Sequence, residues 1–165
     1  MAKQNLPSTP ALLALRAGGV AFVPHLYPYV DKGGTRHSST ALGVDEHQVI
    51  KTIVLETADK TPLVCLMHGD RQISTKQLAR VLGTKTVQPC DPAVAQRHTG
   101  YLVGGTSPFG MRKWLPVYVE RTILALPVLY INGGARGLLV EIVPRVLTDL
   151  LAATPVDVAM ATDPR

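Results

Sequence analysis

The sequence predicts an α+β fold of the broad α/β class, in which helices flank a largely antiparallel or mixed β-sheet. Its 165 residues suffice for one domain with a buried core. Hydrophobic residues make up 46% and charged residues 18%, as in globular proteins, which argues against disorder. Helix and strand patterns follow one another without regular βαβ alternation. We therefore expect residues 1–165 to form a single compact domain.

The first helix and the first strand are marked by proline and glycine. Thr9 is a good N-cap, Pro10 suits the first helical position, and Gly18 and Gly19 end the helix. The stretch VAFVPHLYPYV, residues 20–30, then alternates apolar residues as a strand does. Its prolines cannot donate to a neighbouring strand, so this strand is expected at an edge of the sheet.

A polar stretch separates the edge strand from two central strands. Residues 31–39 are expected to form a loop, followed by a short helix that ends at Leu42, and Asp45 opens one further turn. The stretches KTIVLE (51–56) and PLVCLM (62–67) are two strands joined by the turn TADKT. This spacing predicts a hairpin.

Two further helices are expected in the middle of the chain. Ser74 and Gln77 form a capping-box pattern, and the helix that follows ends at Gly83. Its spacing predicts that Leu78, Val81 and Leu82 form the buried face. Asp91 and Pro92 open the next helix, which stops at Gly100.

Three strands and a last helix complete the expected order. The strands are LPVYVE (115–120), PVLYI (127–131) and GLLVEIV (137–143), and turn-forming residues 132–134 separate the last two. Pro144 opens the final helix.

The stretch TGYLVGGTSPFG, residues 99–110, is unusually rich in glycine. Gly105 and Gly110 have the spacing of a phosphate-binding loop, but Met111-Arg112 follow where that loop needs lysine and a hydroxyl residue. A serine-hydrolase elbow would use the N–H of the residue after the serine, and here that residue is Pro108, which has none. Both chemistries are excluded.

Two interpretations of this stretch remain open. Gly104, Gly105, Thr106 and Ser107 each offer a backbone N–H, and two glycines allow a ligand close to the main chain. Such donors suit a polarised carbonyl or a developing oxyanion, and Pro108 would stiffen the end of the loop. The alternative is an ordinary structural turn.

Lys51 is a second unusual residue. If a strand begins there, Lys51 shares a face with Ile53 and Leu55, so a lysine is aligned with core residues. It either extends its ammonium into water or holds a cation near a cavity, where it would meet phosphate or developing negative charge.

Histidine and cysteine spacing predicts neither a metal site nor a disulfide framework. The five histidines show no HExxH or His-x-His pattern, and Cys65 and Cys90 lie 25 positions apart without CxxC spacing. The histidines are His25, His37, His47, His68 and His98.

Charge and hydropathy constrain the partners. A net charge of +5 with a pI near 9.4 favours polyanions, although a solvated surface would give the same balance. No apolar run has the roughly 20 residues of a membrane helix, and no signal-peptide core follows the N-terminus. We expect a cytoplasmic protein without a membrane partner. No basic recognition helix indicates DNA.

The most specific stretches of the chain together resemble a known family. They are STPALLAL, HLY, ALGVDEHQVIKTIVLE, LAR-VLGTKTV, DPAVAQRHTGYLVGGTSPFG and INGGARGLLVEI, in this order. The chain resembles, from about Thr9 to Asp157, the YbaK family of free-standing prolyl-tRNA-editing-like deacylases, which is related to the insertion domain of bacterial prolyl-tRNA synthetases. The most specific parts are the Lys51-Thr52 pair and the TGYxxGGxSPxG segment.

The resemblance implies a compact domain with a curved mixed sheet and hydrolysis of a mischarged aminoacyl-tRNA, typically cysteine on proline tRNA. The family's essential lysine falls on Lys51, and its GxxxP loop falls on Gly104 to Pro108. Tyr27, Thr52 and Arg136 fall on the expected substrate-binding side. An aminoacyl ester is already activated, so the family is thought to rely on the substrate's thiol, or on the terminal ribose hydroxyl and water, for the attack. No cofactor is implied.

Two departures affect the substrate. Many cysteine-specific members carry an aspartate two residues after the Arg-Gly pair, where this chain has Leu139. An aromatic residue expected in the loop after the first strand is missing from GGTRHSS. The amino acid removed, the oligomeric state and any need for a prolyl-tRNA synthetase partner stay open. The rival interpretation is a non-catalytic module that binds aminoacyl-tRNA or a small acyl ligand.

Overall fold

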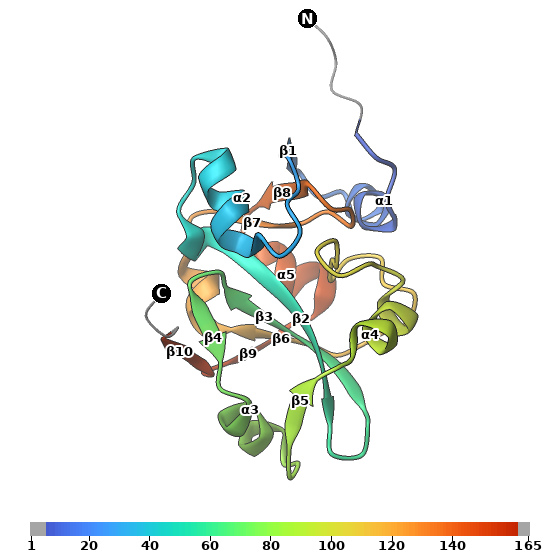
Figure 1. The fold of residues 1–165 in the computed structure, drawn as a ribbon, viewed down its shortest axis with the longest axis vertical. Coiled ribbons are helices and arrows are strands. Elements are labelled where there is room, and N and C mark those ends of the chain that lie inside the picture. The colour runs from blue at the N-terminus through green and yellow to red at the C-terminus, as the bar shows by residue number, and fades with distance from the viewer. Residues whose placement is uncertain (1–5, 162–165) are drawn as a thin grey trace, which may run out of the picture.

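A computed structural model describes residues 6–161 and contains a mixed sheet with helices packed around it (Figure 1). The elements in chain order are α1 (Pro10–Ala17), β1 (Val23–Leu26), α2 (Gly34–Leu42), the 3-10 helix η1 (Glu46–Gln48), β2 (Val49–Thr57), β3 (Pro62–His68), β4 (Arg71–Ile73), α3 (Thr75–Leu82), β5 (Val87–Pro89), α4 (Pro92–Thr99), β6 (Val117–Glu120), the 3-10 helix η2 (Arg121–Ala125), β7 (Leu129–Asn132), β8 (Leu138–Ile142), α5 (Arg145–Leu151), β9 (Thr154–Val156) and β10 (Ala159–Ala161).

The main sheet has the strand order β1-β8-β7-β2-β3-β6-β9, with β5 also paired to β2, and β4 and β10 form a separate pair. β2 and β3 form the predicted antiparallel hairpin. Parallel pairings join β2 to β7, β3 to β6 and β6 to β9, so the sheet is mixed. β1 lies at one end of this order, which confirms the edge position predicted from its prolines.

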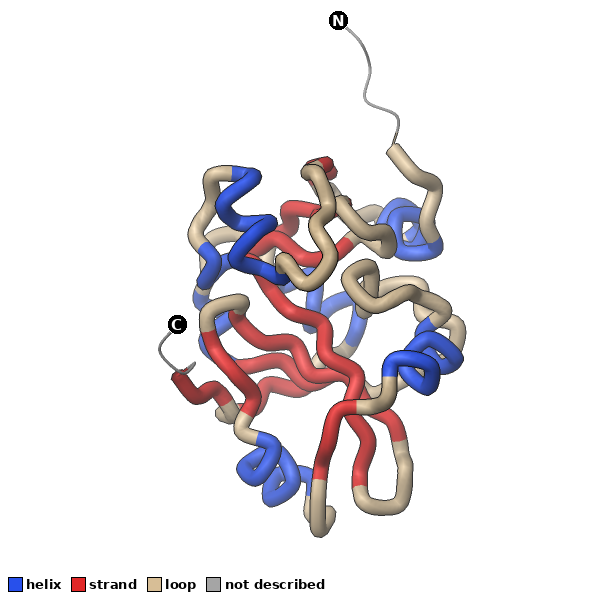
Figure 2. The backbone as a smooth tube through the Cα atoms, viewed as in Figure 1, coloured by secondary structure: helices blue, strands red, loops and turns tan. Residues whose placement is uncertain are grey.

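The two sides of β2 are paired differently. β3 follows it on one side from Ile50 to Glu56. On the other side β7 pairs only with its first two residues, and β5 pairs only from Leu55 onward. Within the described chain, residues 51–54 therefore have no strand neighbour on that side. Figure 2 shows β2 as a long strand that crosses the molecule between these two partners.

Two apolar clusters lie on the two faces of the β2–β3 hairpin. One contains Ile50, Val54 and Leu66 and continues to α1 and α5, and the other contains Leu55, Met67 and Leu78 and is covered by α3. Because side chains alternate along a strand, a single hairpin can contribute to both clusters. The hairpin is therefore the centre of the fold.

Predicted caps are confirmed at two helices. The Thr9 hydroxyl accepts from the Leu12 N–H at 3.1 Å, and the Ser74 hydroxyl accepts from the Gln77 N–H at 3.2 Å. Thr9 also donates to the carbonyl of Gly133, at 2.6 Å and 124 positions along the chain. Each cap satisfies an N–H that would otherwise lack a partner at a helix start.

Two local predictions were wrong. Residues 31–39 are not all loop, because α2 already begins at Gly34. Val81 is not buried but 53% exposed, while Leu78 is fully buried. The short strands β4, β5, β9 and β10 carry too few residues to show a period of two, and the sequence patterns did not predict them. No described helix is long and apolar enough to cross a membrane.

Candidate functional site

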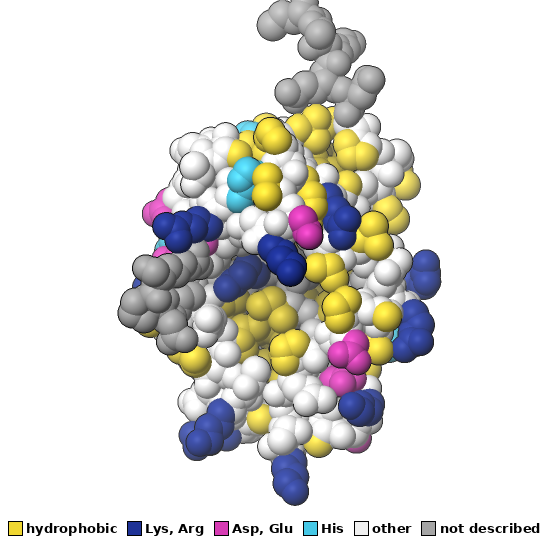
Figure 3. Space-filling view, viewed as in Figure 1, with side chains coloured by type: hydrophobic (Ala, Val, Ile, Leu, Met, Phe, Trp, Pro, Cys, Tyr) yellow, Lys and Arg dark blue, Asp and Glu magenta, His cyan; other side chains and the backbone are white. Residues whose placement is uncertain are grey.

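A cavity of about 460 Å³ opens beside the part of β2 that lacks a strand neighbour. Predicted site residues that line it are Tyr27, Lys51, Thr52, Gly104 and Thr106. Figure 3 shows this face, with basic side chains around a hollow that has an apolar floor. The structure thus brings Lys51 together with a loop more than fifty residues further along the chain.

Four other predicted residues do not line the cavity. Gly105, Ser107 and Pro108 are buried, and Arg136 is exposed but is not part of the cavity wall. The Ser107 side chain is 0% exposed, and its hydroxyl accepts from the Phe109 N–H at 3.1 Å. Ser107 therefore closes a local turn.

The backbone donors of the glycine loop divide into two groups. The Gly105 N–H donates to the Leu102 carbonyl at 2.9 Å, so it is used within the loop. Among the residues that the structure describes, the N–H groups of Gly104 and Thr106 have no protein acceptor. The predicted cradle of donors is therefore narrower than the sequence suggested, and its members on the cavity wall are Gly104 and Thr106.

Position 104 requires glycine because of its backbone conformation and because of a close neighbouring side chain. Its φ of +86° lies in the left-handed region, and a Cβ there would lie 2.6 Å from the Tyr29 hydroxyl. Gly105 allows close approach of a second loop, since its Cβ would lie 3.0 Å from the Arg136 backbone nitrogen. Both glycines thus permit contacts that any larger residue would obstruct.

Side chains from β7 and the following turn hold the glycine loop in place. The Asn132 amide donates to the Gly104 carbonyl at 3.0 Å, and Arg136 Nε donates to the Val103 carbonyl at 2.9 Å. The Arg136 guanidinium lies 5.2 Å from the centre of the Tyr29 ring, within range of a cation–π contact. Arg136 therefore supports the loop, and in this structure it does not reach into the cavity.

Sequence reasoning missed Tyr29 and Asn132, although both line the cavity. Asn132 follows a strand directly, and an amide at a strand end beside two glycines was the available signal. The loop and first turn of α2 also reach the wall with Asp31, Lys32, Thr35, His37 and Ser38. His37 Nε2 lies 2.6 Å from the Pro28 carbonyl oxygen and so helps to fix this segment.

Lys51 is half-buried, and its ammonium donates to the carbonyl of Arg71. The neighbouring Thr52 has a buried hydroxyl without a hydrogen-bond partner among the described residues. A buried hydroxyl without a partner is costly, so this atom is available to a ligand in the cavity. Burial also raises the pKa of the nearby Tyr27, which keeps its phenol neutral.

Cys90 lines the cavity as a thiol. Burial, followed by the charges of Glu56 and Asp91, raises its pKa to about 11. The thiolate is the nucleophilic form of cysteine, so Cys90 at neutral pH is a poor nucleophile. Cys65 is buried elsewhere, with a pKa raised to about 12 by burial and by Glu120.

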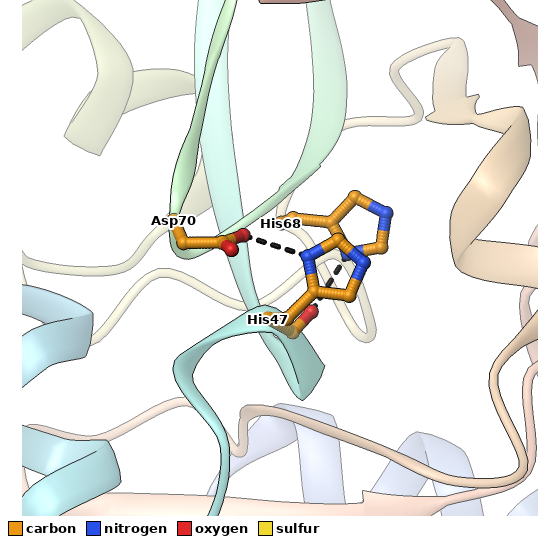
Figure 4. Close-up of side chains that lie close together, drawn as sticks. All are labelled: His47, His68 and Asp70. Atoms are coloured by element: carbon orange, nitrogen blue, oxygen red, sulfur yellow. Dashed lines mark hydrogen bonds and ion pairs between the residues drawn. The ribbon is translucent and has the colours of Figure 1, made fainter. Parts of the chain in front are cut away.

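His47, His68 and Asp70 form a cluster near the start of β2 and the end of β3 (Figure 4). His47 Nδ1 is 2.8 Å from an Asp70 oxygen, and His68 Nδ1 donates to the His47 carbonyl at 2.7 Å. Burial opposes ionisation of Asp70, but the His47 hydrogen bond and the charges of His47 and Arg71 give it a lowered pKa. The cluster fixes the turn whose next residue, Arg71, accepts from Lys51.

The same cluster has donor atoms close enough together for a metal ion. However, the rings of His47 and His68 are stacked, with centroids 3.7 Å apart and planes 6° from parallel. Ring nitrogens bind metals in the plane of their ring, so one ion cannot lie in both planes. Both nitrogens of His68 are also engaged, Nδ1 by His47 and Nε2 by Thr122 at 2.8 Å. The geometry favours a structural role.

Comparison with known proteins identifies relatives of this chain. The family profile described as "Aminoacyl-tRNA editing domain" matches residues 35–150. EbsC of Enterococcus faecalis, whose name describes a Cys-tRNA(Pro)/Cys-tRNA(Cys) deacylase, is 29% identical over 110 residues, which are 67% of each chain. A proline–tRNA ligase of Desulforamulus reducens is 34% identical over 85 residues, or 52% of this chain and 15% of the ligase.

Solved structures share the fold. A crystal structure described as a trans-editing enzyme for prolyl-tRNA synthetase superposes with a TM-score of 0.81 at 22% identity, covering 94% of this chain and all of the other. The hypothetical protein APE2540 superposes with a TM-score of 0.84 at 22% identity, covering 92% and 99%. At this identity the likeness concerns the fold, including its mixed sheet. Because the family profile spans α2 to α5 and includes both Lys51 and the glycine loop, the chain belongs to the aminoacyl-tRNA editing domain family.

Proposed function

We propose that this protein hydrolyses the ester bond of mischarged aminoacyl-tRNA, with cysteine attached to proline tRNA as the substrate. One observation carries the proposal: Lys51, Gly104 and Thr106 line the same cavity. Family membership supports it, and the name of EbsC describes the same reaction. The cavity of about 460 Å³ has the size of a small-molecule site.

The reaction needs no nucleophile from the protein. The attacking oxygen or sulfur adds to the ester carbonyl carbon, the bond to the ribose oxygen breaks, and that oxygen takes up a proton. Among the described residues of the wall, no hydroxyl is hydrogen-bonded to a histidine, and Cys90 is held as a thiol. The attacking group therefore comes from water or from the substrate, whose ester is already activated.

The protein contributes electrostatic stabilisation and position. The N–H groups of Gly104 and Thr106 are placed to donate to the oxyanion that forms on the carbonyl oxygen. A well-placed donor of this kind is worth about 3–4 kcal/mol in the transition state. Lys51 holds a positive charge at the wall, where it anchors the terminal phosphate or steadies developing charge. Beside it lies the buried Thr52 hydroxyl, which has no hydrogen-bond partner in the part of the chain that the structure describes.

The test is a deacylation assay with labelled amino acid on a panel of tRNAs. We expect release from Cys-tRNA(Pro) to be fastest, slower release from other small aminoacyl groups, and none from correctly charged Pro-tRNA(Pro). The Lys51→Met protein is the matched control, because it keeps most of the apolar stem. Binding of the panel without release above the spontaneous rate would instead establish the non-catalytic binding module.

A prolyl-tRNA synthetase is the partner that this substrate implies, since such an enzyme produces the mischarged tRNA. The relatives support this indirectly, because the matched segment lies within proline–tRNA ligases. Association is measured by adding the synthetase to the deacylation assay. A rate that does not change at saturating synthetase would mean that the protein acts alone.

A further inference from the structure

Trp114, the single tryptophan of the chain, is 83% exposed. It is the most exposed of the large hydrophobic side chains in the described residues. Tryptophan is on average well covered in a folded chain, and it is enriched at surfaces that bind a partner. The proposed cavity does not use this residue, since Trp114 is not on its wall.

Backbone hydrogen bonds hold the segment before Trp114 against helix α4. The Arg112 N–H donates to the Thr99 carbonyl at 2.9 Å, and the Lys113 N–H donates to the His98 carbonyl at 3.1 Å. Helix α4 supplies another exposed cation, Arg97. We call Arg97, Arg112, Lys113 and Trp114 the indole platform.

The three cations of the indole platform are not neutralised. None of them has an acidic partner within the described residues. Burial lowers the pKa of His98, and the charges of Lys113 and Arg97 lower it further. Both cations therefore lie close enough to His98 to affect its ionisation. A cation at the end of a helix is favoured by the helix dipole, which accounts for Arg97 but not for the other two.

Helix α4 connects the indole platform with the cavity. It lines the cavity with Pro92 and Ala95 and carries Arg97 on a different face, about 200° further around the helix than Ala95. Figure 3 shows basic side chains on the side of the molecule where Figure 1 places α4. A polymer whose end enters the cavity can therefore reach the platform with a part that passes around α4.

We propose that the indole platform binds single-stranded RNA, with a base stacked on Trp114 and phosphates held by the three cations. Every base has a π-face, so stacking on an aromatic side chain tolerates any sequence. Lysine and arginine contacts to phosphate supply the remaining affinity. The RNA is the tRNA substrate only if the proposed function holds, whereas the stacking chemistry does not depend on it. An apolar protein surface would have to cover three unpaired charges, so the polyanion is favoured.

Fluorescence tests the stacking directly, because all tryptophan emission comes from Trp114. We expect an eight-nucleotide single-stranded RNA and uncharged proline tRNA both to quench this emission, with saturation and with weaker binding at higher salt. RNA binding detected by anisotropy of a labelled RNA, without any change in tryptophan emission, would overturn the proposal.

Variants separate stacking from other contacts, with affinity measured by anisotropy. Trp114→Leu should bind RNA roughly tenfold more weakly, because it keeps apolar area but loses the π-face, whereas Trp114→Phe should lose only about twofold to threefold. Wild-type affinity in Trp114→Leu would overturn the proposal, since a partner that needs only apolar area would then remain.

Charge removal supplies the matched control. The double variant Arg112→Ala/Lys113→Ala should reduce the dependence of log affinity on log salt by about 1.4, or about 0.7 for each phosphate contact. Lys76→Ala/Arg80→Ala removes two exposed cations from α3 and should change Trp114 quenching much less. Equal losses in both double variants would mean that only net charge matters, which contradicts a local platform.

These readouts do not require hydrolysis. If quenching is found but no aminoacyl-tRNA is cleaved, the proposed function fails and the indole platform stands. If Cys-tRNA(Pro) is cleaved but Trp114 emission is unaffected by RNA, the platform fails and the proposed function stands. If the proposed function and the indole platform are both correct, Trp114→Leu should raise the KM for intact tRNA. It should leave the cleavage of a short aminoacyl-nucleoside ester unchanged.

Discussion

The side-chain amide of Asn132 donates to the carbonyl oxygen of Gly104 at 3.0 Å, and it also donates to the Ala135 carbonyl at 3.2 Å. Its oxygen accepts from the Gly134 N–H at 2.6 Å. A single side chain at the end of β7 therefore joins the turn after that strand to the glycine loop. The amide holds the peptide plane that contains the Gly104 carbonyl and the Gly105 N–H. The Gly104 N–H lies in the preceding plane, whose Val103 carbonyl accepts from Arg136 Nε.

Asn132→Ala should lower the deacylation rate by tenfold or more and the free energy of unfolding by about 1–3 kcal/mol, because polar groups of two loops lose their partner. Rates on Cys-tRNA(Pro) and melting curves measure the two effects. Asn132→Asp keeps the acceptor for Gly134 but places a carboxylate against two carbonyl oxygens, so it should not restore activity. A wild-type rate in Asn132→Asp would contradict the role of the donated bonds.

Lys51→Met should reduce kcat/KM at least a hundredfold and leave the melting temperature within a few degrees. The charge at the cavity wall is lost, while the apolar stem continues to pack along β2. Single-turnover rates and thermal melts measure this. An unchanged rate in a folded variant would mean that the ammonium has a structural role, such as its bond to the Arg71 carbonyl, and does not act in the reaction.

Gly105→Val and Ser107→Ala should behave differently. A Cβ at Gly105 would lie 3.0 Å from the Arg136 nitrogen and 3.1 Å from the Ala135 carbonyl carbon, so valine should separate two loops, lower the melting temperature and abolish turnover. Ser107→Ala loses one bond from the Phe109 N–H, worth about 0.5–1.5 kcal/mol, and should keep its rate within a few-fold. The opposite pattern would identify Ser107 as the nucleophile.

Leu139 is 4% exposed and contributes to the cavity wall, so its size should influence which amino acid is removed. Leu139→Ala should favour larger aminoacyl groups relative to cysteine by roughly tenfold, since a methylene in a pocket is worth about 1–3 kcal/mol. The ratio of kcat/KM for the two substrates measures this, with Leu139→Met as the control of similar volume. An unchanged ratio in Leu139→Ala would place the aminoacyl side chain elsewhere.

Acid should destabilise the fold through His68, which is 1% exposed and whose pKa burial lowers. His68 in the folded state therefore binds a proton less readily than in the unfolded chain, where its pKa is near 6.5. The free energy of unfolding should reach its maximum contribution from His68 above about pH 6.5. Below that pH it should decrease by at most about 1.4 kcal/mol per pH unit for this group. Urea titrations from pH 8 to 5 measure the slope, and His68→Gln should flatten it. Greater stability at pH 5 would contradict this.

Local chemistry explains what could be predicted from the sequence. The caps at Thr9 and Ser74 and the hairpin of β2 and β3 depend on residues a few positions apart, and all three are present. Val81 has the spacing of a buried residue but is exposed, because α3 buries only a narrow stripe. The start of α2 at Gly34 could not be recognised, since its first turn is polar and lacks a side-chain cap.

The candidate site could be predicted only in part, and not from local chemistry. Composition and spacing singled out Lys51 and the glycine loop but favoured a structural turn and a solvated lysine, and the family resemblance indicated a site. Tyr29 and Asn132 act on Gly104 only because β7 and the segment after β1 lie against the loop, which no local pattern encodes. The His47–His68–Asp70 cluster likewise depends on the pairing of β2 with β3.

The bond from the Thr9 hydroxyl to the Gly133 carbonyl joins parts of the chain that are 124 positions apart. Its neighbours in the fold, β1 and β8, are similarly distant in sequence. Closing such long loops costs chain entropy before any contact is gained, so these pairings are expected to form late during folding. The glycine loop, which is packed against residues 133–136, can become ordered only after them. A growing polypeptide would therefore acquire its hairpin early and its ability to hold an ester only when nearly the whole chain has been synthesised.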